Sequence, residues 1–351
     1  MLSAEIARVR KDANNKQNQA GAPAPTQSEH MRCDPPARHR RHLGPGTRTP
    51  YAKRMFDRMT FCHLLRASAI VLTLAPWIRT SAQDLRYARV SREVIESRLR
   101  KYDGGDKQRE ATLKQFFADA GCDDQHLSEQ PVHGSSLPNI LCMLPGSSDK
   151  VIIVGAHFDH VSKGDGVVDN RSGAALLPSL YETVKTEPRM HTYIFIGFTD
   201  EEKGEVGSAF YVRHMTKEEV AATAAMVNMD TLGLGPTEVW GSHSDQLLTG
   251  ALGYIAKRLN LPVRIEDVDQ VGSSDSEQFA TRKIPRITVH SLTQKTYDAR
   301  ILHTANDKIS AMRLDDYYQT YSLMAAYLAF LDQMPTGTAP TSPSGNGAKT
   351  Q

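Results

Sequence analysis

The chain has 351 residues, of which 40% are hydrophobic and 23% are charged, as in ordinary soluble globular proteins. Its net charge of +2 hides an asymmetry, because residues 1–82 contain 14 Lys/Arg and 5 Asp/Glu whereas the remainder contains 28 and 35. The basic charge therefore belongs mainly to the N-terminal segment. This distribution excludes a nucleic-acid partner inferred from overall basicity.

The N-terminal segment has the composition of a leader. Residues 1–54 are rich in Arg, Pro, Asn, Gln and Ala, which does not suffice to bury a core. Residues 55–82 combine a basic flank, a 12-residue largely apolar run and three small residues, as is typical of a secretory signal peptide. The apolar run is short for a membrane span, and Pro76 interrupts it. We therefore expect cleavage near Gln83, a secreted or periplasmic mature protein, and no stable membrane span.

A signal peptide normally starts at the first residue of a chain, and this one would not. Residues 1–54 are therefore interpreted as a disordered extension or as the result of a misplaced start codon, with translation beginning at Met55 or Met59. The alternative is a buried helix or a membrane anchor at the apolar run, preceded by a disordered arm.

From residue 91 onward, helical and extended patterns alternate along the chain. Ser91 is a plausible N-cap of the first helix. Further helices are expected at residues 107–120, 172–185, 207–214, 217–222, 247–259 and 314–331, the last of them amphipathic, and strands at residues 139–144, 150–156, 192–199, 224–229, 238–241 and 285–290. This alternation indicates an α/β architecture with a mostly parallel or mixed sheet. The folded domain is expected over residues 83–333, followed by a disordered tail at 334–351.

Four cysteines are present. Cys33 and Cys62 fall in the segment expected to be removed, which leaves Cys122 and Cys142 in the exported domain. An even pair in an oxidising compartment permits one disulfide. Because Cys142 lies in an apolar strand pattern, a buried free thiol is the alternative. Neither spacing resembles a zinc–cysteine site.

Metal-ligand types recur in order along the domain. The candidates are His157, Asp169, Glu202, Asp230 and His303. Two imidazoles and three carboxylates are one ligand too many for a single tetrahedral zinc, but they suit two zincs that share a bridging carboxylate and a water. Most of them directly follow an apolar strand, and the carboxyl ends of adjacent strands converge on one crevice. The pattern favours a two-metal hydrolase.

The local contexts suggest individual roles. Asp159, two residues after His157, can orient that imidazole. The three acids Asp200, Glu201 and Glu202 repel one another unless cations lie near. On an extended segment Glu201 and Glu202 would point to opposite sides, one toward metal and one toward a water whose proton it takes.

Each candidate also has a plain structural interpretation. His157 could pack at a strand end, Asp169 could cap a helix, Asp230 could form a turn, and His303 could be one of 13 unremarkable histidines. The remaining candidates are assigned to packing or to the surface: His160, His191, His214, His243 and His290.

Taken together, residues 135–330 resemble the zinc-dependent exopeptidases of the M28 peptidase family, of the bacterial leucyl-aminopeptidase type. The matching motifs are Gly155-Ala-His157-Phe-Asp159, Asp169-Asn-Arg-Ser-Gly173, Glu201-Glu202-Lys-Gly-Glu-Val-Gly207-Ser208, Asn228-Met-Asp230, Ser274-Asp275 through Phe279, Ile284-Pro285 and His303-Thr304. The resemblance implies a three-layer α/β/α fold with a mixed, mostly parallel central sheet.

The same resemblance implies a site. His157 and Asp230 would bind one zinc, Glu202 and His303 the other, and Asp169 would bridge the two. Glu201 would be the general base and Asp159 would orient His157. The family often has a cis peptide after the bridging aspartate, here Asp169–Asn170. Some members carry a tyrosine directly before the last histidine for the oxyanion; Leu302 occupies that position, which leaves Tyr297 or a zinc for this role.

The implied function is an exported di-zinc aminopeptidase that hydrolyses the N-terminal residues of peptides or proteins, with Glu201 taking the proton of a zinc-bound water. One alternative is a glutaminyl-cyclase-like acyltransferase with a single zinc. Another is a carboxypeptidase, for which Arg264, Arg282 and Arg286 are available to hold a terminal carboxylate. A catalytically silent binding domain would have lost a ligand or the base, and none is missing. The sequence does not indicate an oligomeric state.

Overall fold

The computed structural model describes residues 85–334. The expected extension and signal peptide, and residues 335–351 of the expected tail, lie outside this range. Among the described residues, no helix is long and apolar enough to cross a membrane.

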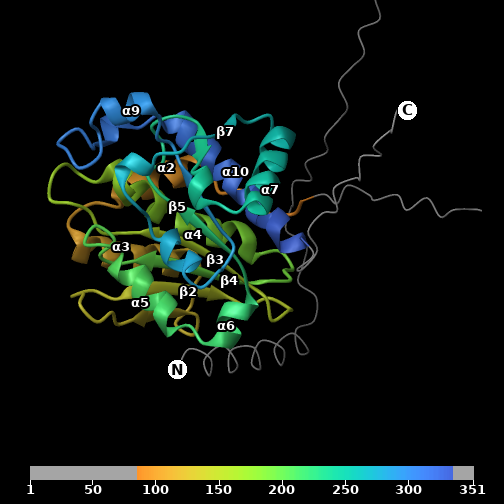
Figure 1. The fold of residues 1–351 in the computed structure, drawn as a ribbon. Helices are drawn as coiled ribbons and strands as arrows, with labels where there is room; N and C mark the ends of the chain where they lie inside the picture. Colours follow the sequence, from red (N-terminus) through yellow and green to blue (C-terminus); the bar gives the residue numbers. More distant parts are fainter. Residues whose placement is uncertain (1–84, 335–351) are drawn as a thin grey trace, which may run out of the picture. The chain divides into compact units, whose positions relative to one another are not determined.

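A single mixed sheet forms the centre of the described domain (Figure 1). Its strands are β1 (Leu127–Gln130), β2 (Asn139–Leu144), β3 (Val151–His157), β4 (Thr192–Phe198), β5 (Thr223–Met229), β6 (Thr237–Val239), β7 (Val263–Ile265) and β8 (Arg286–His290), in the order β1-β2-β4-β3-β5-β8-β6-β7. The inner strands β4, β3, β5 and β8 are parallel, as are β6 and β7. The pairs β1–β2, β2–β4 and β6–β8 are antiparallel.

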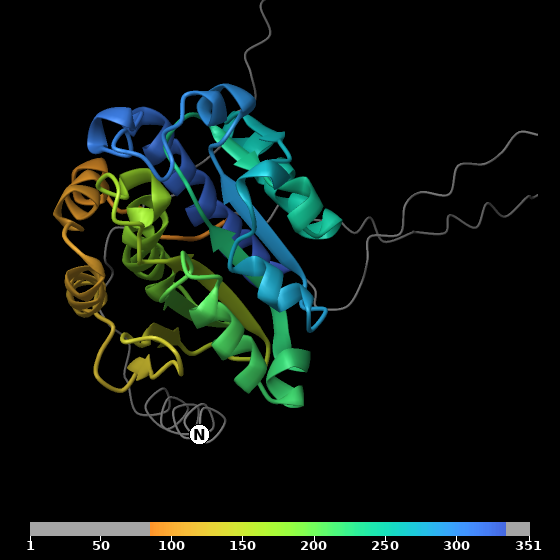
Figure 2. The ribbon, with the colours of Figure 1, turned by 60° about the vertical axis from the view of Figure 1, so that its left-hand side comes forward.

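Helices cover both faces of the sheet, which confirms the three-layer α/β/α architecture (Figure 2). One face packs against α3 (Asp106–Asp119), α4 (Ser172–Lys185), α7 (Gln246–Leu259) and α10 (Leu314–Gln333), with α2 (Arg92–Lys101) lying against α4 and α10. The other face carries α5 (Val206–His214), α6 (Lys217–Ala222) and α8 (Ser276–Ala280).

The central strands are mainly apolar because both of their faces are buried. In β3, Ile152 and Val154 belong to the core under α4, whereas Val151 and Ile153 belong to the core under α5 and α8. Successive side chains of a strand alternate between the two faces, so a strand between two helical layers is apolar along most of its length. The helix cap at Ser91 is also confirmed, since its hydroxyl accepts the N–H of Val94.

The elements that the pattern did not predict include β1, β7, α8 and α9 (Gln294–Asp298). The two strands lie at the sheet edges and are largely exposed, so they lack the apolar signal of the inner strands. The expectation that α10 is amphipathic is wrong. Most of its residues are buried, because α10 packs against α4, α7, α2 and β6 together.

Cys122 and Cys142 form a disulfide, so the free-thiol alternative does not apply. The bond joins the end of α3 to β2 and closes around the edge strand β1.

Candidate metal centre

Three neighbouring parallel strands deliver the first candidate residues to one edge of the sheet. His157 is the last residue of β3, Asp230 follows β5 directly, and Glu201 comes three residues after the end of β4. Because β4, β3 and β5 are parallel neighbours, their carboxyl ends meet, as open α/β sheets require of a shared crevice.

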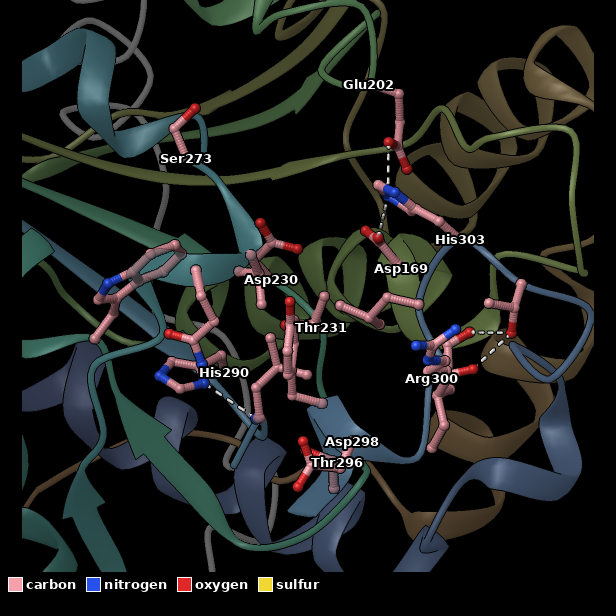
Figure 3. Close-up of a pocket in the computed structure, with 18 of the residues that line it drawn as sticks. Asp169, Glu202, Asp230, Thr231, Ser273, His290, Thr296, Asp298, Arg300 and His303 are labelled. Atoms are coloured by element: carbon pink, nitrogen blue, oxygen red, sulfur yellow. Dashed lines mark hydrogen bonds and ion pairs between the residues drawn. The ribbon is translucent and has the colours of Figure 1, made fainter. Parts of the chain in front are cut away.

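Asp169 lies between two histidines that are far apart in the sequence. Its Oδ1 atom is 3.2 Å from Nε2 of His157, and its Oδ2 atom is 3.1 Å from Nε2 of His303. Each carboxylate oxygen therefore faces a different imidazole, which is the arrangement of a bridging ligand (Figure 3 shows Asp169 beside His303).

The two remaining candidate ligands complete the two halves. Oδ1 of Asp230 is 3.5 Å from Nε2 of His157, and Oε2 of Glu202 is 2.9 Å from Nε2 of His303. Among the described residues, two groups could each hold a metal ion: His157, Asp169 and Asp230, and Asp169, Glu202 and His303. The structure thus brings all five sequence-predicted ligands together, in the two sets expected.

The helix-cap interpretation of Asp169 is wrong, because its neighbour Asn170 performs that task. Oδ1 of Asn170 accepts the N–H of Gly173 at 2.9 Å, and its Nδ2 donates to the carbonyl of Met229 at 2.9 Å. The Asp169–Asn170 peptide is cis, as the resemblance implied. With the N-terminus of α4 bonded to Asn170, the Asp169 carboxylate faces the histidines.

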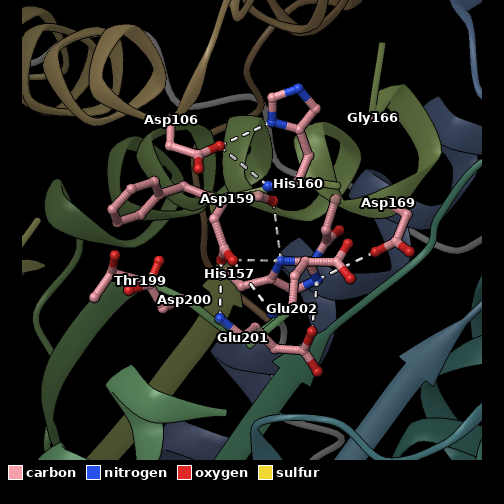
Figure 4. Close-up of polar contacts among 12 residues, drawn as sticks. Asp106, His157, Asp159, His160, Gly166, Asp169, Thr199, Asp200, Glu201 and Glu202 are labelled. Carbon is pink, nitrogen blue, oxygen red and sulfur yellow. Dashed lines mark hydrogen bonds and ion pairs between the residues drawn. The ribbon is translucent and has the colours of Figure 1, made fainter. Parts of the chain in front are cut away.

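Asp159 contacts not only His157, its expected partner, but also the backbone of the two glutamates after β4 (Figure 4). Its Oδ1 accepts the N–H of Glu201 at 3.0 Å, and its Oδ2 accepts the N–H of Glu202 at 3.2 Å. Nδ1 of His157 lies 3.5 Å from this carboxylate and 3.2 Å from the carbonyl oxygen of Asp159. Asp159 therefore couples the β3 end to the backbone of the acidic turn, in addition to facing His157.

The acids after β4 do not lie on an extended segment, and that expectation is wrong. Asp200 has a φ of 52°, and the carbonyl of Glu201 accepts the N–H groups of Gly204 and Glu205, so the chain turns here. The two glutamates still diverge, since Oε2 of Glu201 lies 3.9 Å from Nε2 of His157 while Glu202 contacts His303.

Burial and neighbouring charges shift the pKa values of several groups in the site. For the protein groups alone, the pKa of Glu201 is raised to about 10; burial is the largest cause, His157 opposes it, and Asp275, Asp230 and Asp169 act in the same direction as burial. Contacts with Asp169 and Glu202 raise the pKa of His303 to about 10. Burial also raises the pKa of Asp275 to about 8.

These residues fit divalent cations. Oδ1 of Asp230 and Oε1 of Glu202 are buried without a hydrogen-bond partner. Buried carboxylate oxygens without partners are costly unless a cation is near. The donor set of imidazole and carboxylate atoms is the one that zinc takes in catalytic sites.

A second layer of hydrogen bonds supports the ligands. Ser274 Oγ donates to Oδ2 of Asp230 at 2.6 Å and receives the side-chain N–H of Asn228 at 2.7 Å. Asp307 accepts the backbone N–H groups of Val168 and Asp169. Asn228 and Ser274 stood in the recognised motifs, but no local pattern in the sequence assigns these partners.

A cavity of about 640 Å³ opens over this cluster (Figure 3). Its apolar wall consists of Trp240, Val271, Leu292, Ile301 and Leu302. Tyr297 also lines the cavity and is 43% exposed. Sequence reasoning missed Arg300, a further lining residue.

One of the remaining histidines, His290, lies beside the site. His290 was assigned to packing or the surface; it is buried at the cavity wall, where Nδ1 accepts the N–H of Leu292 and Nε2 faces the carbonyl of Glu266. Burial lowers the pKa of His290 to about 4, so the ring is neutral and structural.

The three arginines considered for a terminal carboxylate lie elsewhere. Arg264 pairs with Glu238 at 2.8 Å, Arg286 pairs with Glu277, and Arg282 donates to the carbonyl of Val212 at 2.9 Å. None of the three lines the cavity.

Parts of the chain are similar in sequence to known proteins. Residues 139–328 match Peptidase family M28. An aminopeptidase from Pseudomonas aeruginosa is 34% identical over 114 residues, which cover 32% of this chain and 21% of that protein, so the chain spans about a fifth of that relative's length.

Two solved structures share the fold. The Legionella pneumophila LapA aminopeptidase superposes with a TM-score of 0.61 at 20% identity, covering 70% of this chain and 73% of that one. A glutaminyl cyclase from an Acidobacteriales bacterium superposes with a TM-score of 0.57 at 16% identity, covering 72% and 98%.

Proposed function

This chain belongs to peptidase family M28, and we propose that it is an exported di-zinc aminopeptidase that removes N-terminal residues from peptides or proteins. One observation carries the proposal. Two candidate ligand groups share Asp169, and Glu201, a fourth carboxylate that belongs to neither group, lines the same cavity.

In this proposal His157 and Asp230 would hold one zinc ion, Glu202 and His303 would hold the other, and Asp169 would be shared by both. When bound, the ions supply Lewis acidity and lower the pKa of a water molecule.

Glu201 acts as the general base. Its carboxylate is held next to His157 by the turn whose N–H groups bond to Asp159, and it lines the cavity. From there it takes a proton from the attacking water and returns it to the leaving amine. Asp159 is a positioning residue, since it fixes both His157 and the backbone of Glu201.

The cavity suits the N-terminus of a peptide. Glu201 and Asp230 line it as carboxylates that accept hydrogen bonds from a substrate ammonium group. The apolar wall around Trp240 and Leu302 suits an apolar side chain next to the scissile bond. The side chain of Leu302 has no hydrogen-bond donor. The hydroxyl of Tyr297, which lines the cavity, would stabilise the oxyanion, or bound zinc would supply that stabilisation.

Export is supported by two independent features. Residues 55–82 have the pattern of a signal peptide. The described domain contains the Cys122–Cys142 disulfide, and disulfides persist mainly in oxidising compartments.

The fold is shared with a glutaminyl cyclase, so a single-zinc acyltransferase is the competing function. The complete second ligand group of Asp169, Glu202 and His303 favours two zincs and hydrolysis. Zinc stoichiometry separates the two functions.

The test compares wild type with Glu201→Gln. We expect about two zincs per chain in both, and hydrolysis of aminoacyl anilides that is roughly 100- to 10,000-fold slower in the variant, because a positioned base contributes that much. Glu218→Gln, on the exposed start of α6, is the matched control and should keep full activity. One zinc per chain, or undiminished activity of Glu201→Gln, would refute the mechanism.

A further inference from the structure

The cavity carries charge of both signs. Its lining includes the carboxylates of Asp169, Glu201, Glu202, Asp230 and Asp298. Arg300 is the one arginine or lysine among the lining residues in the described part of the chain. It is labelled in Figure 3 well apart from Glu202 and Ser273.

Arg300 is not used to neutralise these acids. No ion pair joins its guanidinium to any carboxylate among residues 85–334, although five carboxylates line the same cavity. The nearest acid in sequence, Asp298, accepts the side-chain N–H of Gln294 at 2.8 Å instead. An arginine that neutralised the acidic cluster would form an ion pair with at least one of its carboxylates.

The position of Arg300 is fixed by its backbone. Its N–H donates to the carbonyl of Tyr297 at 3.0 Å, and its carbonyl accepts the hydroxyl of Thr304 at 2.7 Å and the side-chain N–H of Asn306 at 3.3 Å. Its φ of 50° lies in the left-handed region, so these bonds hold the turn in a conformation that arginine rarely adopts. The same turn continues into His303, which ties Arg300 to the metal centre.

We propose that Arg300 binds a carboxylate of the substrate, so that the enzyme prefers peptides with a negative charge close to the scissile bond. This inference rests on the proposed function and adds a substrate class to it. A guanidinium presents parallel N–H donors that match a carboxylate. A cavity that holds both the carboxylates of the metal centre and a guanidinium complements a zwitterionic peptide. The carboxylate comes either from the C-terminus of a di- or tripeptide or from an acidic side chain.

The experiment measures kcat/KM for two substrate pairs that differ only in the carboxylate. The dipeptide Leu-Ala is compared with its C-terminal amide, and the anilide of glutamate with that of glutamine. Arg300→Gln should lower kcat/KM roughly 10-fold for the charged member of one pair and leave its neutral partner unchanged, as expected for loss of a charge-assisted hydrogen bond. The affected pair identifies the source of the carboxylate.

Two further variants sharpen the result. Arg300→Lys keeps the charge and should recover part of the preference. Arg213→Gln, at an exposed position on α5 outside the cavity lining, should change neither ratio. If the substitution at Arg300 only disturbs the local structure, kcat/KM will fall alike for all four substrates. That result, or unchanged ratios of kcat/KM within both pairs, would overturn the proposal.

A binding measurement distinguishes failure of the proposed hydrolase function from failure of the proposed role of Arg300. Calorimetric binding of Leu-Ala and its amide, and of glutamate and glutamine anilides, is compared between Glu201→Gln and Glu201→Gln/Arg300→Gln. If the wild type hydrolyses none of the four substrates, the hydrolase proposal fails. The role of Arg300 is then decided by binding alone. Tighter binding of the charged ligand of a pair, lost in the double variant, supports that role, and no such preference contradicts it.

Discussion

Asp307 lies four residues after His303 and is almost fully buried. Its carboxylate accepts the N–H of Val168 at 2.7 Å and that of Asp169 at 3.1 Å, and its carbonyl accepts the N–H of Asp165 at 2.8 Å. One residue thus joins the loop of the bridging ligand to the loop of the last histidine. The spacing of the two loops, and with it the distance between Asp169 and His303, depends on this carboxylate.

We expect Asp307→Asn to weaken zinc binding roughly 10-fold or more, because an amide offers one acceptor oxygen where the carboxylate offers two, and losses of this size follow from changes around metal ligands. Competition with a chelator measures the zinc dissociation constant. The exposed Asp124→Asn is the control and should match the wild type. An unchanged zinc dissociation constant in Asp307→Asn, with a native circular dichroism spectrum, would contradict this role.

At the scale of elements, the sheet edge is stabilised by a covalent link. The strand β1 pairs only with β2 and is largely exposed, so packing contributes little to its position. The disulfide between Cys122 and Cys142 spans 20 residues that include β1. It connects the C-terminal end of α3 to a strand whose neighbour, β4, leads into the acidic turn.

The double variant Cys122→Ser/Cys142→Ser should lower the free energy of unfolding by about 3 kcal/mol, the value expected for a closed loop of this length in the chain-entropy account. Urea unfolding measures the change. A reductant should destabilise the wild type by a similar amount and leave the double variant unaffected. Zinc stoichiometry should stay the same, since neither cysteine touches the ligands; equal stability of both proteins would rule out a stabilising disulfide.

At the scale of the molecule, the charge asymmetry and the disulfide both support the proposed export. The acidic domain follows a basic N-terminal segment in the sequence, which falls outside the described residues. Disulfides persist mainly in oxidising compartments, and the proposed signal peptide at residues 55–82 would direct the chain to one.

N-terminal sequencing of the protein recovered from culture medium or periplasm should find a first residue near Gln83. Mass spectrometry without reductant should show the mature chain two hydrogens lighter than the fully reduced form, because Cys33 and Cys62 have been removed and the other two are paired. A protein that stays in the cytoplasm with its leader intact would contradict export.

Much of the fold follows from local sequence. The strand at 139–144 and the helix at 172–185 have the expected bounds, because a buried strand and a well-buried helix carry strong apolar patterns. The edge strands β1 and β7 escaped prediction, since exposed edges carry no such pattern. The position of the helix α10 was predicted, but its extensive burial was not, because that burial depends on partners distant in sequence.

The candidate site divides in the same way. The sequence alone determined which five side chains were candidate ligands, because strand-end positions and short motifs are local properties; that they bind zinc stays a prediction. Only the tertiary structure decided that Asp169 faces both histidines, that Asn170 caps α4 in its place, that Asp159 and Asp307 hold the ligand loops, and that Arg300 lines the cavity. These facts depend on loops without periodicity, whose paths are set by hydrogen bonds between residues far apart in the chain.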